Sequence, residues 1–278
     1  MNLKSSLLIF LIICNINFSQ QKMNLDILQG IKNPNLVGDS IKLEKNTFLA
    51  YKKMEKAALS EGIHLKIVSA YRGYDRQKFI WNRKFGKYTN EYALDPIKAI
   101  YEIIRFSTIP GTSRHHWGTE IDIIDEDFSD EENVLMSSKY EKKGIFFKVK
   151  QWMNSNSEKF GFYITYNNDP ERKGFEYEPW HYSYAPVSKK MLALFLKSDL
   201  KKLIKKDEIN GSEHFTDEFI EKYKNEKIVI KYGGNVLIDR DIFNNFIEDI
   251  NILNKLGLSI VVVHGGCLLY TSDAADDS

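Results

Sequence analysis

Patterns typical of helices and of strands follow one another along most of the chain. From Asn46 onwards, apolar residues recur at helical spacing until Gly62, a residue that favours the end of a helix. Residues 64–70 then alternate between apolar and polar side chains, which predicts a strand whose Leu65 and Ile67 share one face. The same reasoning predicts helices over residues 77–85, capped by Asp75, 95–106 and 146–160, and strands over residues 119–124, 162–166 and 180–184. This mixture is typical of an α+β domain in which helices flank a small antiparallel sheet.

The N-terminus has a pattern of its own. Lys4 precedes an unbroken apolar run from Leu7 to Ile13, and the sequence then becomes polar. The run is too short to span ~30 Å of hydrocarbon, and Ser19 is a small residue near a cleavage point. We therefore expect residues 1–20 to form a signal peptide, with a buried N-terminal helix as the alternative. Export to the periplasm or cell envelope follows, with no stable membrane span after cleavage. Residues 22–45 continue as a polar lead-in.

The composition changes near residue 222. Residues 227–232 predict a β-branched strand, residues 242–256 an amphipathic helix and residues 258–263 an apolar strand. Together they predict one β-α-β unit, which then stops.

Composition and charge exclude several classes of function. With 43% hydrophobic and 28% charged residues, the chain of 278 residues can bury a sizeable core. A formal net charge of +1 gives no electrostatic attraction to nucleic acid. Only two cysteines, Cys14 and Cys267, are present and they lie near opposite ends, which excludes a disulfide framework and a thiolate metal cage. A metal would therefore depend on histidine and carboxylate ligands.

Three residues far apart in the sequence could supply such ligands. His115 follows a Pro-Gly loop, Asp122 lies on the next predicted strand, and His181 lies on the last one. Two imidazoles and one carboxylate suit a catalytic zinc ion, whose fourth position stays open for water. Two alternatives remain at this point, because His116 adjoins His115 and Glu120 shares a strand face with Asp122.

Three motifs follow one another along the chain: Ser69-Ala70-Tyr71-Arg72, the stretch Ser113-Arg114-His115-His116-Trp117-Gly118-Thr119-Glu120-Ile121-Asp122, and Glu178-Pro179-Trp180-His181. Together they resemble the zinc D-Ala-D-Ala carboxypeptidase and dipeptidase family, relatives of the vancomycin-resistance peptidases, over about residues 40–220. The middle motif matches Ser-x-His-x-x-Gly-x-x-x-Asp. Glu120 departs from the family pattern, since many members carry a small residue there.

The resemblance implies a role for each residue. His115, Asp122 and His181 would bind Zn²⁺, and Glu178 would be the general base that activates water. Arg72 would face the developing oxyanion or the substrate carboxylate, because its planar fork suits either anion. The side chains expected to contact the substrate are Ser113, Tyr71 and Trp180.

The implied function is hydrolysis of D-alanyl-D-alanine, or a related stem-peptide bond, in peptidoglycan. Carboxypeptidase, dipeptidase and endopeptidase activities use the same metal chemistry and stay open. A different class of function, a non-catalytic zinc-containing module that binds cell-wall peptides, would have no need of Glu178. The peptidase domain would cover residues 21–222.

The C-terminal β-α-β unit, residues 223–266, resembles the start of acetylglutamate kinase. The resemblance rests on Ile230-Lys231-Tyr232-Gly233-Gly234-Asn235 and Val262-Val263-His264-Gly265-Gly266. We predict no kinase activity, because a single unit lacks the rest of a nucleotide pocket. Residues 267–278 break the kinase pattern and resemble a translated sequencing adapter, so we interpret them as an artefactual tail.

Overall fold

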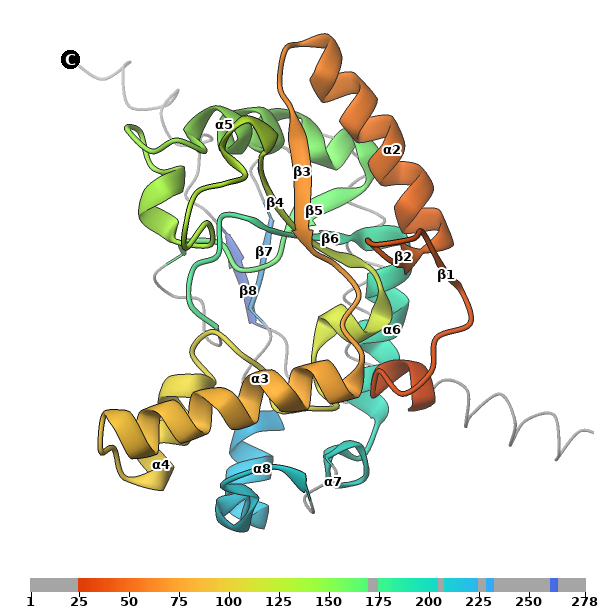
Figure 1. The fold of residues 1–278 in the computed structure, drawn as a ribbon. Coiled ribbons are helices and arrows are strands. Elements are labelled where there is room, and N and C mark those ends of the chain that lie inside the picture. Colours follow the sequence, from red (N-terminus) through yellow and green to blue (C-terminus); the bar gives the residue numbers. More distant parts are fainter. Residues whose placement is uncertain (1–24, 170–174, 205–207, 225–228, 233–260, 265–278) are drawn as a thin grey trace, which may run out of the picture. The chain divides into compact units, whose positions relative to one another are not determined.

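The computed structural model describes residues 25–169, 175–204, 208–224, 229–232 and 261–264 (Figure 1). It divides into two compact units, of which the first includes the chain up to Asp169 and Phe175–Glu221, and the second includes Lys222–Ser278. The predicted signal peptide (residues 1–20), the helix over residues 242–256 and the tail over residues 267–278 lie outside the described residues.

A four-stranded antiparallel sheet is the centre of the first unit. Its strands follow the spatial order β3 (Leu65–Ser69), β4 (Glu120–Asp125), β6 (His181–Tyr184) and β5 (Phe162–Ile164). All four predicted strands are present, each within two residues of its predicted ends. The α+β class with a small antiparallel sheet is therefore confirmed.

Several helices and two further short strands near the N-terminus accompany this sheet. The helices are α2 (Lys45–Ser60), α3 (Tyr74–Gly86), α4 (Pro96–Ile103), α5 (Phe147–Asn156), α6 (Ala185–Lys197), α7 (Leu200–Leu203) and α8 (Asp217–Lys224). The π-helical turn η1 (Lys87–Glu91) extends α3. The 3₁₀ turns are η2 (Arg114–Trp117), η3 (Glu126–Phe128), η4 (Ser137–Tyr140), η5 (Ser157–Phe160) and η7 (Ser212–His214). The short strands β1 (Leu36–Val37) and β2 (Leu43–Glu44) pair with each other, so the predicted lead-in contains a small hairpin.

Local chemistry explains where the helices begin. The carboxylate of Glu44 accepts hydrogen bonds from the backbone of Asn46 and Thr47, which caps α2. Asp95 caps α4 in the same way, with Pro96 in the first turn. The prediction that Asp75 caps α3 is wrong: Gly73 is the cap residue, and Asp75 lies inside the first turn, where its charge favours the helix N-terminus.

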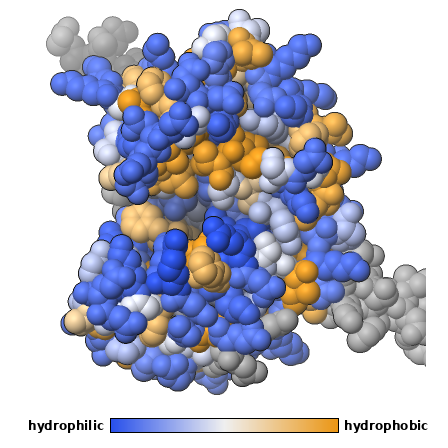
Figure 2. All heavy atoms as spheres, in the orientation of Figure 1, coloured by the Kyte–Doolittle hydropathy of each residue, from blue (hydrophilic) through white to orange (hydrophobic). Residues whose placement is uncertain are grey.

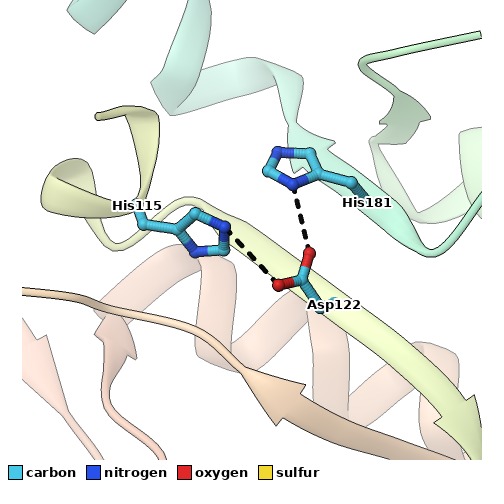
Figure 3. A group of neighbouring side chains, drawn as sticks. All are labelled: His115, Asp122 and His181. Atoms are coloured by element: carbon cyan, nitrogen blue, oxygen red, sulfur yellow. Dashed lines mark ion pairs between the residues drawn. The ribbon is translucent and has the colours of Figure 1, made fainter. Parts of the chain in front are cut away.

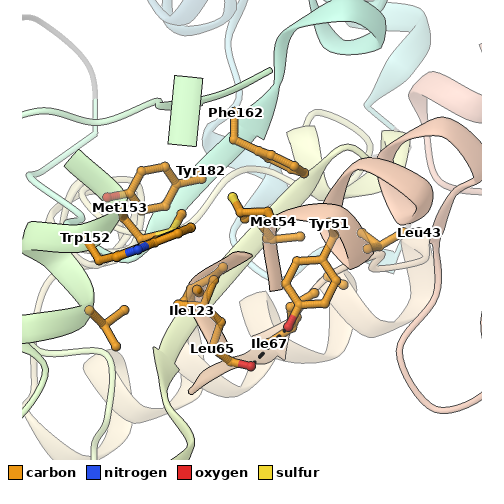
Figure 4. Packing of buried hydrophobic residues seen from close by; sticks show 14 residues of the cluster. Leu43, Tyr51, Met54, Leu65, Ile67, Ile123, Trp152, Met153, Phe162 and Tyr182 are labelled. Carbon is orange, nitrogen blue, oxygen red and sulfur yellow. Dashed lines mark hydrogen bonds between the residues drawn. The ribbon is translucent and has the colours of Figure 1, made fainter. Parts of the chain in front are cut away.

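One face of the sheet forms the main core with α2 and α5 (Figure 4). Ile121 and Ile123 of β4 are fully buried there, and the hydroxyl of Tyr51 donates a hydrogen bond to the carbonyl of Leu65 at 3.2 Å. Burial of each large aliphatic side chain contributes ~1.5–3 kcal/mol. Because successive strand residues point to opposite faces, Glu120 and Asp122 lie on the other face of β4.

The register of the sheet sets the positions of the polar residues on that other face. Asp122 pairs with His181 on β6 and with Ser69 on β3, where a shift between Ile67 and Ser69 interrupts the regular pairing. Directly opposed residues of antiparallel strands have Cβ atoms about 4.5–5.5 Å apart. The backbone therefore brings two residues separated by 59 positions into contact.

Residues beyond β6 pack against α3, an arrangement that the sequence patterns did not predict. The fully buried Trp81 donates from Nε1 to the carbonyl of Asn210 at 3.0 Å, and its ring meets Phe215 edge-on at 5.8 Å. The backbone of Glu208 accepts a hydrogen bond from Asn82 at 3.0 Å. The chain after the sheet thus anchors α3.

The second unit shows one parallel strand pair among its described residues. β7 (Val229–Tyr232) pairs with β8 (Val261–His264) in register, Val229 opposite Val261. Parallel pairing agrees with the predicted β-α-β unit. In the described part of the chain, no helix has the length and apolar character needed to cross a membrane.

Candidate metal centre

Three ligand-type side chains converge on the polar face of the sheet (Figure 3). His115 comes from η2, Asp122 from the middle of β4, and His181 from the first position of β6. One ligand atom from each lies within 4.8 Å of the others, and all three residues are buried. They form the one such group among the described residues.

Gly118 explains how the chain turns from His115 into β4. It ends η2 in the left-handed region with φ +74°, which glycine adopts without strain. A Cβ atom there would lie 2.7 Å from Leu36 and 2.9 Å from the backbone nitrogen of Glu44. The glycine of the motif is therefore required by both its conformation and the close approach of the β1–β2 hairpin.

Hydrogen bonds fix which nitrogen each imidazole presents to the centre. Nδ1–H of His115 donates to the carbonyl of Ala70 at 2.7 Å, so the lone pair is on Nε2, which lies 3.6 Å from Asp122 Oδ2. Nε2–H of His181 donates to Glu120 Oε2 at 2.8 Å, and Nδ1 lies 3.1 Å from Asp122 Oδ1. Both rings are oriented by outer partners, as is usual for metal-binding histidines.

The two alternatives left by the sequence are placed elsewhere. Both nitrogens of the fully buried His116 are engaged, because Nδ1–H donates to the carbonyl of Arg72 at 2.6 Å and Nε2 accepts from the backbone of Gly111 at 3.2 Å. Glu120 contacts the Nε2 edge of His181, whereas Asp122 contacts the Nδ1 edge. Neither His116 nor Glu120 belongs to the convergent group.

The donor set fits a zinc ion. Oδ1 of Asp122 is buried and makes no hydrogen bond in the structure, although Nδ1 of His181 lies 3.1 Å away. A buried carboxylate oxygen without a partner costs ~1–3 kcal/mol or more, which a cation would offset. Two nitrogens and one carboxylate oxygen are the ligands that catalytic zinc sites use.

Charge and burial set the protonation of the two histidines. Burial, with a smaller contribution from the charge of Arg72, lowers the pKa of His115 to about 3, so its imidazole is neutral. Burial also acts to lower the pKa of His181, but Asp122 and Glu120 outweigh it and raise the pKa to about 10. A cation that binds between His181 and Asp122 must therefore displace a proton from Nδ1.

Glu178 lies next to the convergent group. It belongs to the turn before β6, and its backbone N–H donates a hydrogen bond to the carbonyl of Tyr166 at 3.0 Å. Its Oε2 lies 3.5 Å from Nδ1 of His181, on the edge of the ring that faces Asp122. Burial, opposed in part by the charge of His181, raises the pKa of Glu178 to about 7, a value suited to accepting a proton near neutral pH.

Arg72 is held between two neutral partners. Nη1 donates to Oε1 of Gln77 at 2.8 Å and Nη2 donates to Oγ of Ser69 at 3.0 Å, while Gln77 itself donates to the carbonyl of Thr108 at 2.8 Å. Burial lowers the pKa of Arg72, against the opposing charges of Asp122 and Glu178, yet a guanidinium stays protonated. A positioned cation therefore faces the site.

A cavity of about 410 Å³ opens over the centre and is lined by residues of α3 and of the sheet; the space-filling view shows the surface hollowed there (Figure 2). The predicted residues that line it are Arg72, Ser113, His115, Asp122, Glu178, Trp180 and His181. Tyr71 is not among the lining residues, since its hydroxyl donates to the carbonyl of Gly30 at 3.2 Å. The structure therefore does not support Tyr71 as a wall of the cleft.

Sequence reasoning missed other lining residues, among them Lys84, Tyr166 and Phe175. Lys84 lies seven positions after Gln77 on α3, so the helical period places both on one face. The helical period could therefore have identified Lys84 as a cavity-lining candidate, once the contact between Gln77 and Arg72 was known. Tyr166 packs at 4.8 Å from the ring of His181, a tertiary contact without a local signal.

Comparison with known families decides the relationship. Residues 40–187, over half of the chain, match the family model of VanY, D-alanyl-D-alanine carboxypeptidase. The chain belongs to the VanY family. The chain is also similar to the carboxypeptidase YodJ of Bacillus subtilis, with 34% identity over 159 residues, which cover 57% of this chain and 51% of YodJ. The chain thus spans about half the length of that relative.

Two further similarities concern the fold and the C-terminus. A solved structure of the vancomycin-resistance D,D-pentapeptidase VanY with Zn(II) is 22% identical, with a TM-score of 0.45 over 62% of this chain and 89% of that one. Residues 226–273 match the amino acid kinase family model. Acetylglutamate kinase of Pelagibacter ubique is 51% identical over 49 residues, 18% of this chain and 17% of that protein. The family matches of residues 40–187 and 226–273 confirm the two resemblances predicted from the sequence.

Proposed function

We propose that this protein is a zinc-dependent D,D-carboxypeptidase that hydrolyses D-alanyl-D-alanine, or a related stem-peptide bond, in peptidoglycan. The observation that carries the proposal is the convergence of His115, Asp122 and His181 beside Glu178 in one cavity. Membership of the VanY family supports the class of substrate. Such a substrate is found outside the cytoplasm, in accord with a signal peptide over residues 1–20 and a peptidase domain over residues 21–222.

The chain's own groups can perform the proton transfers of peptide hydrolysis. A zinc ion held by His115, Asp122 and His181 would supply Lewis-acid chemistry, acidifying water and polarising a carbonyl. Glu178 takes a proton from the attacking water at its carboxylate and later delivers it to the leaving amine. Its pKa of about 7 allows it to accept and to release that proton near neutral pH.

The cations of the cavity suit a substrate with a free carboxylate. Arg72 is fixed by Gln77 and Ser69 and can donate to the developing oxyanion or to the C-terminal carboxylate. Lys84, which also lines the cavity, adds a second positive charge. Ser113 and Trp180 are buried lining residues that can contact the peptide, Ser113 by a hydrogen bond and Trp180 by packing.

Glu178→Gln in the full chain tests the proposal. Wild-type protein should contain zinc and release D-alanine from a stem pentapeptide, and a chelator should abolish the release. Glu178→Gln should keep its zinc but lose ~10²–10⁴-fold in turnover, because the amide cannot accept the proton. Glu176→Gln is the matched control, since Glu176 is exposed and pairs with Arg105 at 3.0 Å, outside the cavity lining.

Three outcomes would contradict the proposal in different ways. Full activity of Glu178→Gln would remove the assigned base. Wild-type protein that binds zinc and stem peptide but leaves the peptide intact would favour a non-catalytic binding module. Wild-type protein without zinc would remove the metal centre. Mass spectrometry of digested peptidoglycan fragments identifies the bond that is cut.

A further inference from the structure

Glu120 occupies a fully buried position behind His181. Its Oε2 accepts from Nε2 of His181 at 2.8 Å, and its Oε1 accepts from the hydroxyl of Ser183 at 2.6 Å. Oε1 also lies 3.2 Å from Nη2 of Arg114 and accepts from the hydroxyl of Thr119 at 3.1 Å. Each carboxylate oxygen therefore has its own partners inside the protein.

The sheet register explains why this carboxylate reaches His181 without joining the metal ligands. Glu120 pairs with Ser183 and Asp122 pairs with His181, so Glu120 approaches the ring diagonally from the far side. The two ring nitrogens of an imidazole lie on different edges. With Nε2 held by Glu120, Nδ1 is left to face Asp122 at 3.1 Å.

We propose that Glu120 is a positioning residue for the metal ligand His181, and that Arg114 balances its charge. Glu120 would fix the tautomer of His181, its ring plane and the donor strength of Nδ1, as carboxylates do for metal-bound histidines elsewhere. This inference rests on the proposed zinc site.

Arg114 offsets the cost of burying the carboxylate of Glu120. Its Nη2 also donates to Ser183 at 2.8 Å and to the hydroxyl of Tyr163 at 2.9 Å, and its guanidinium lies 4.9 Å from the ring of Trp117. An uncompensated charge in such a place would be strongly destabilising, whereas a paired and hydrogen-bonded one is not. Because Arg114 balances its charge, Glu120 can stay ionised and accept a strong hydrogen bond from Nε2–H of His181.

A structural role alone is the competing explanation, because a buried ion pair also holds β4 and β6 together. The two explanations differ in zinc affinity. Glu120→Gln keeps the size and one acceptor oxygen but removes the negative charge of the group that accepts from Nε2–H of His181. If Glu120 positions the ligand, zinc affinity should fall by about 10–100-fold. If Glu120 is only structural, the apo protein loses stability while zinc affinity per folded molecule stays unchanged.

The experiment measures the zinc dissociation constant of the full chain by competition with a chromophoric chelator, together with the Tm of the zinc-free protein. Tyr163→Phe is the matched control, because it removes one hydrogen bond of the same network two contacts away from His181. We expect Tyr163→Phe to bind zinc within about threefold of wild type. The double variant Arg114→Met with Glu120→Gln removes both charges, so the affinity can be measured even if Glu120→Gln alone does not fold.

The outcomes separate this inference from the proposed function. Weakened zinc binding in the Glu120 variants, with near wild-type binding in Tyr163→Phe, supports the positioning role. Wild-type zinc affinity in both Glu120→Gln and the double variant would overturn it and leave the zinc peptidase standing. Failure of the wild-type protein to bind zinc would instead overturn the proposed function.

Discussion

Arg72→Lys provides a demanding test of the cavity, because it keeps the positive charge and changes only its geometry. Arg72 uses one arm of its fork on Gln77 and the other on Ser69, at 2.8 and 3.0 Å. A lysine ammonium is a point charge that cannot reproduce this planar arrangement. The variant should therefore retain attraction for an anion while it loses directed hydrogen bonds to it.

The magnitude follows from the bonds that are lost. A hydrogen bond to a charged group contributes about 1.5–3 kcal/mol, and each 1.36 kcal/mol corresponds to about tenfold in rate. Loss of one directed bond to the substrate anion predicts a fall in kcat/KM of roughly 10–150-fold. The variant also leaves the acceptor oxygen of Gln77 or of Ser69 without its donor, which lowers the free energy of unfolding by about 1–3 kcal/mol.

The assay is release of D-alanine from a stem pentapeptide, combined with zinc content and chemical denaturation. Zinc content should stay at the wild-type level, because Arg72 is outside the ligand group. Arg76→Lys, the same substitution on an exposed position of α3, is the control and should behave as wild type. Equal kcat/KM for Arg72→Lys and Arg76→Lys would refute the reasoning, as would loss of zinc from Arg72→Lys.

Other perturbations test separate parts of the site. Zinc affinity, measured by chelator competition, should rise with pH across neutrality with release of a proton, because zinc must displace the proton that Asp122 and Glu120 hold on His181 below its pKa of about 10; a pH-independent affinity would contradict this. His116→Ala should lower the free energy of unfolding by about 2–4 kcal/mol in denaturant titrations, because two buried hydrogen bonds are lost; unchanged stability would show that they contribute nothing. Lys84→Ala should raise KM several-fold with little change in kcat, and an unchanged KM would exclude Lys84 from substrate binding.

Much of the scaffold could be predicted from sequence because its signals are local. Alternation of apolar residues located β3 and β4, and Asp95 with Pro96 located the start of α4. The motif around His115 and Asp122 likewise located two ligand candidates without any knowledge of tertiary structure. The start of α3 was missed, since Gly73 caps it without a side-chain hydrogen bond.

The remaining features depend on contacts between distant segments. Glu120 and Asp122 share a strand face, so the sequence could not distinguish a competing ligand from a partner on the far edge of His181. Only the pairing of β4 with β6 makes that distinction. Lys84 and Tyr166 reach the cavity from a helix and a strand end whose positions relative to the centre are set by packing.

The anchoring of α3 by residues beyond β6 has a practical consequence for expression boundaries. The VanY match ends at residue 187, but Trp81 makes a hydrogen bond to Asn210 and a ring contact with Phe215, both of which lie downstream of that match. A recombinant fragment trimmed to the matched region would expose this indole and loosen the helix that carries Gln77 and Lys84. Fragments intended for crystallisation or kinetics should therefore extend past Phe215. A shorter fragment would still contain His115, Asp122 and His181, but the α3 wall of the cavity would lose its support.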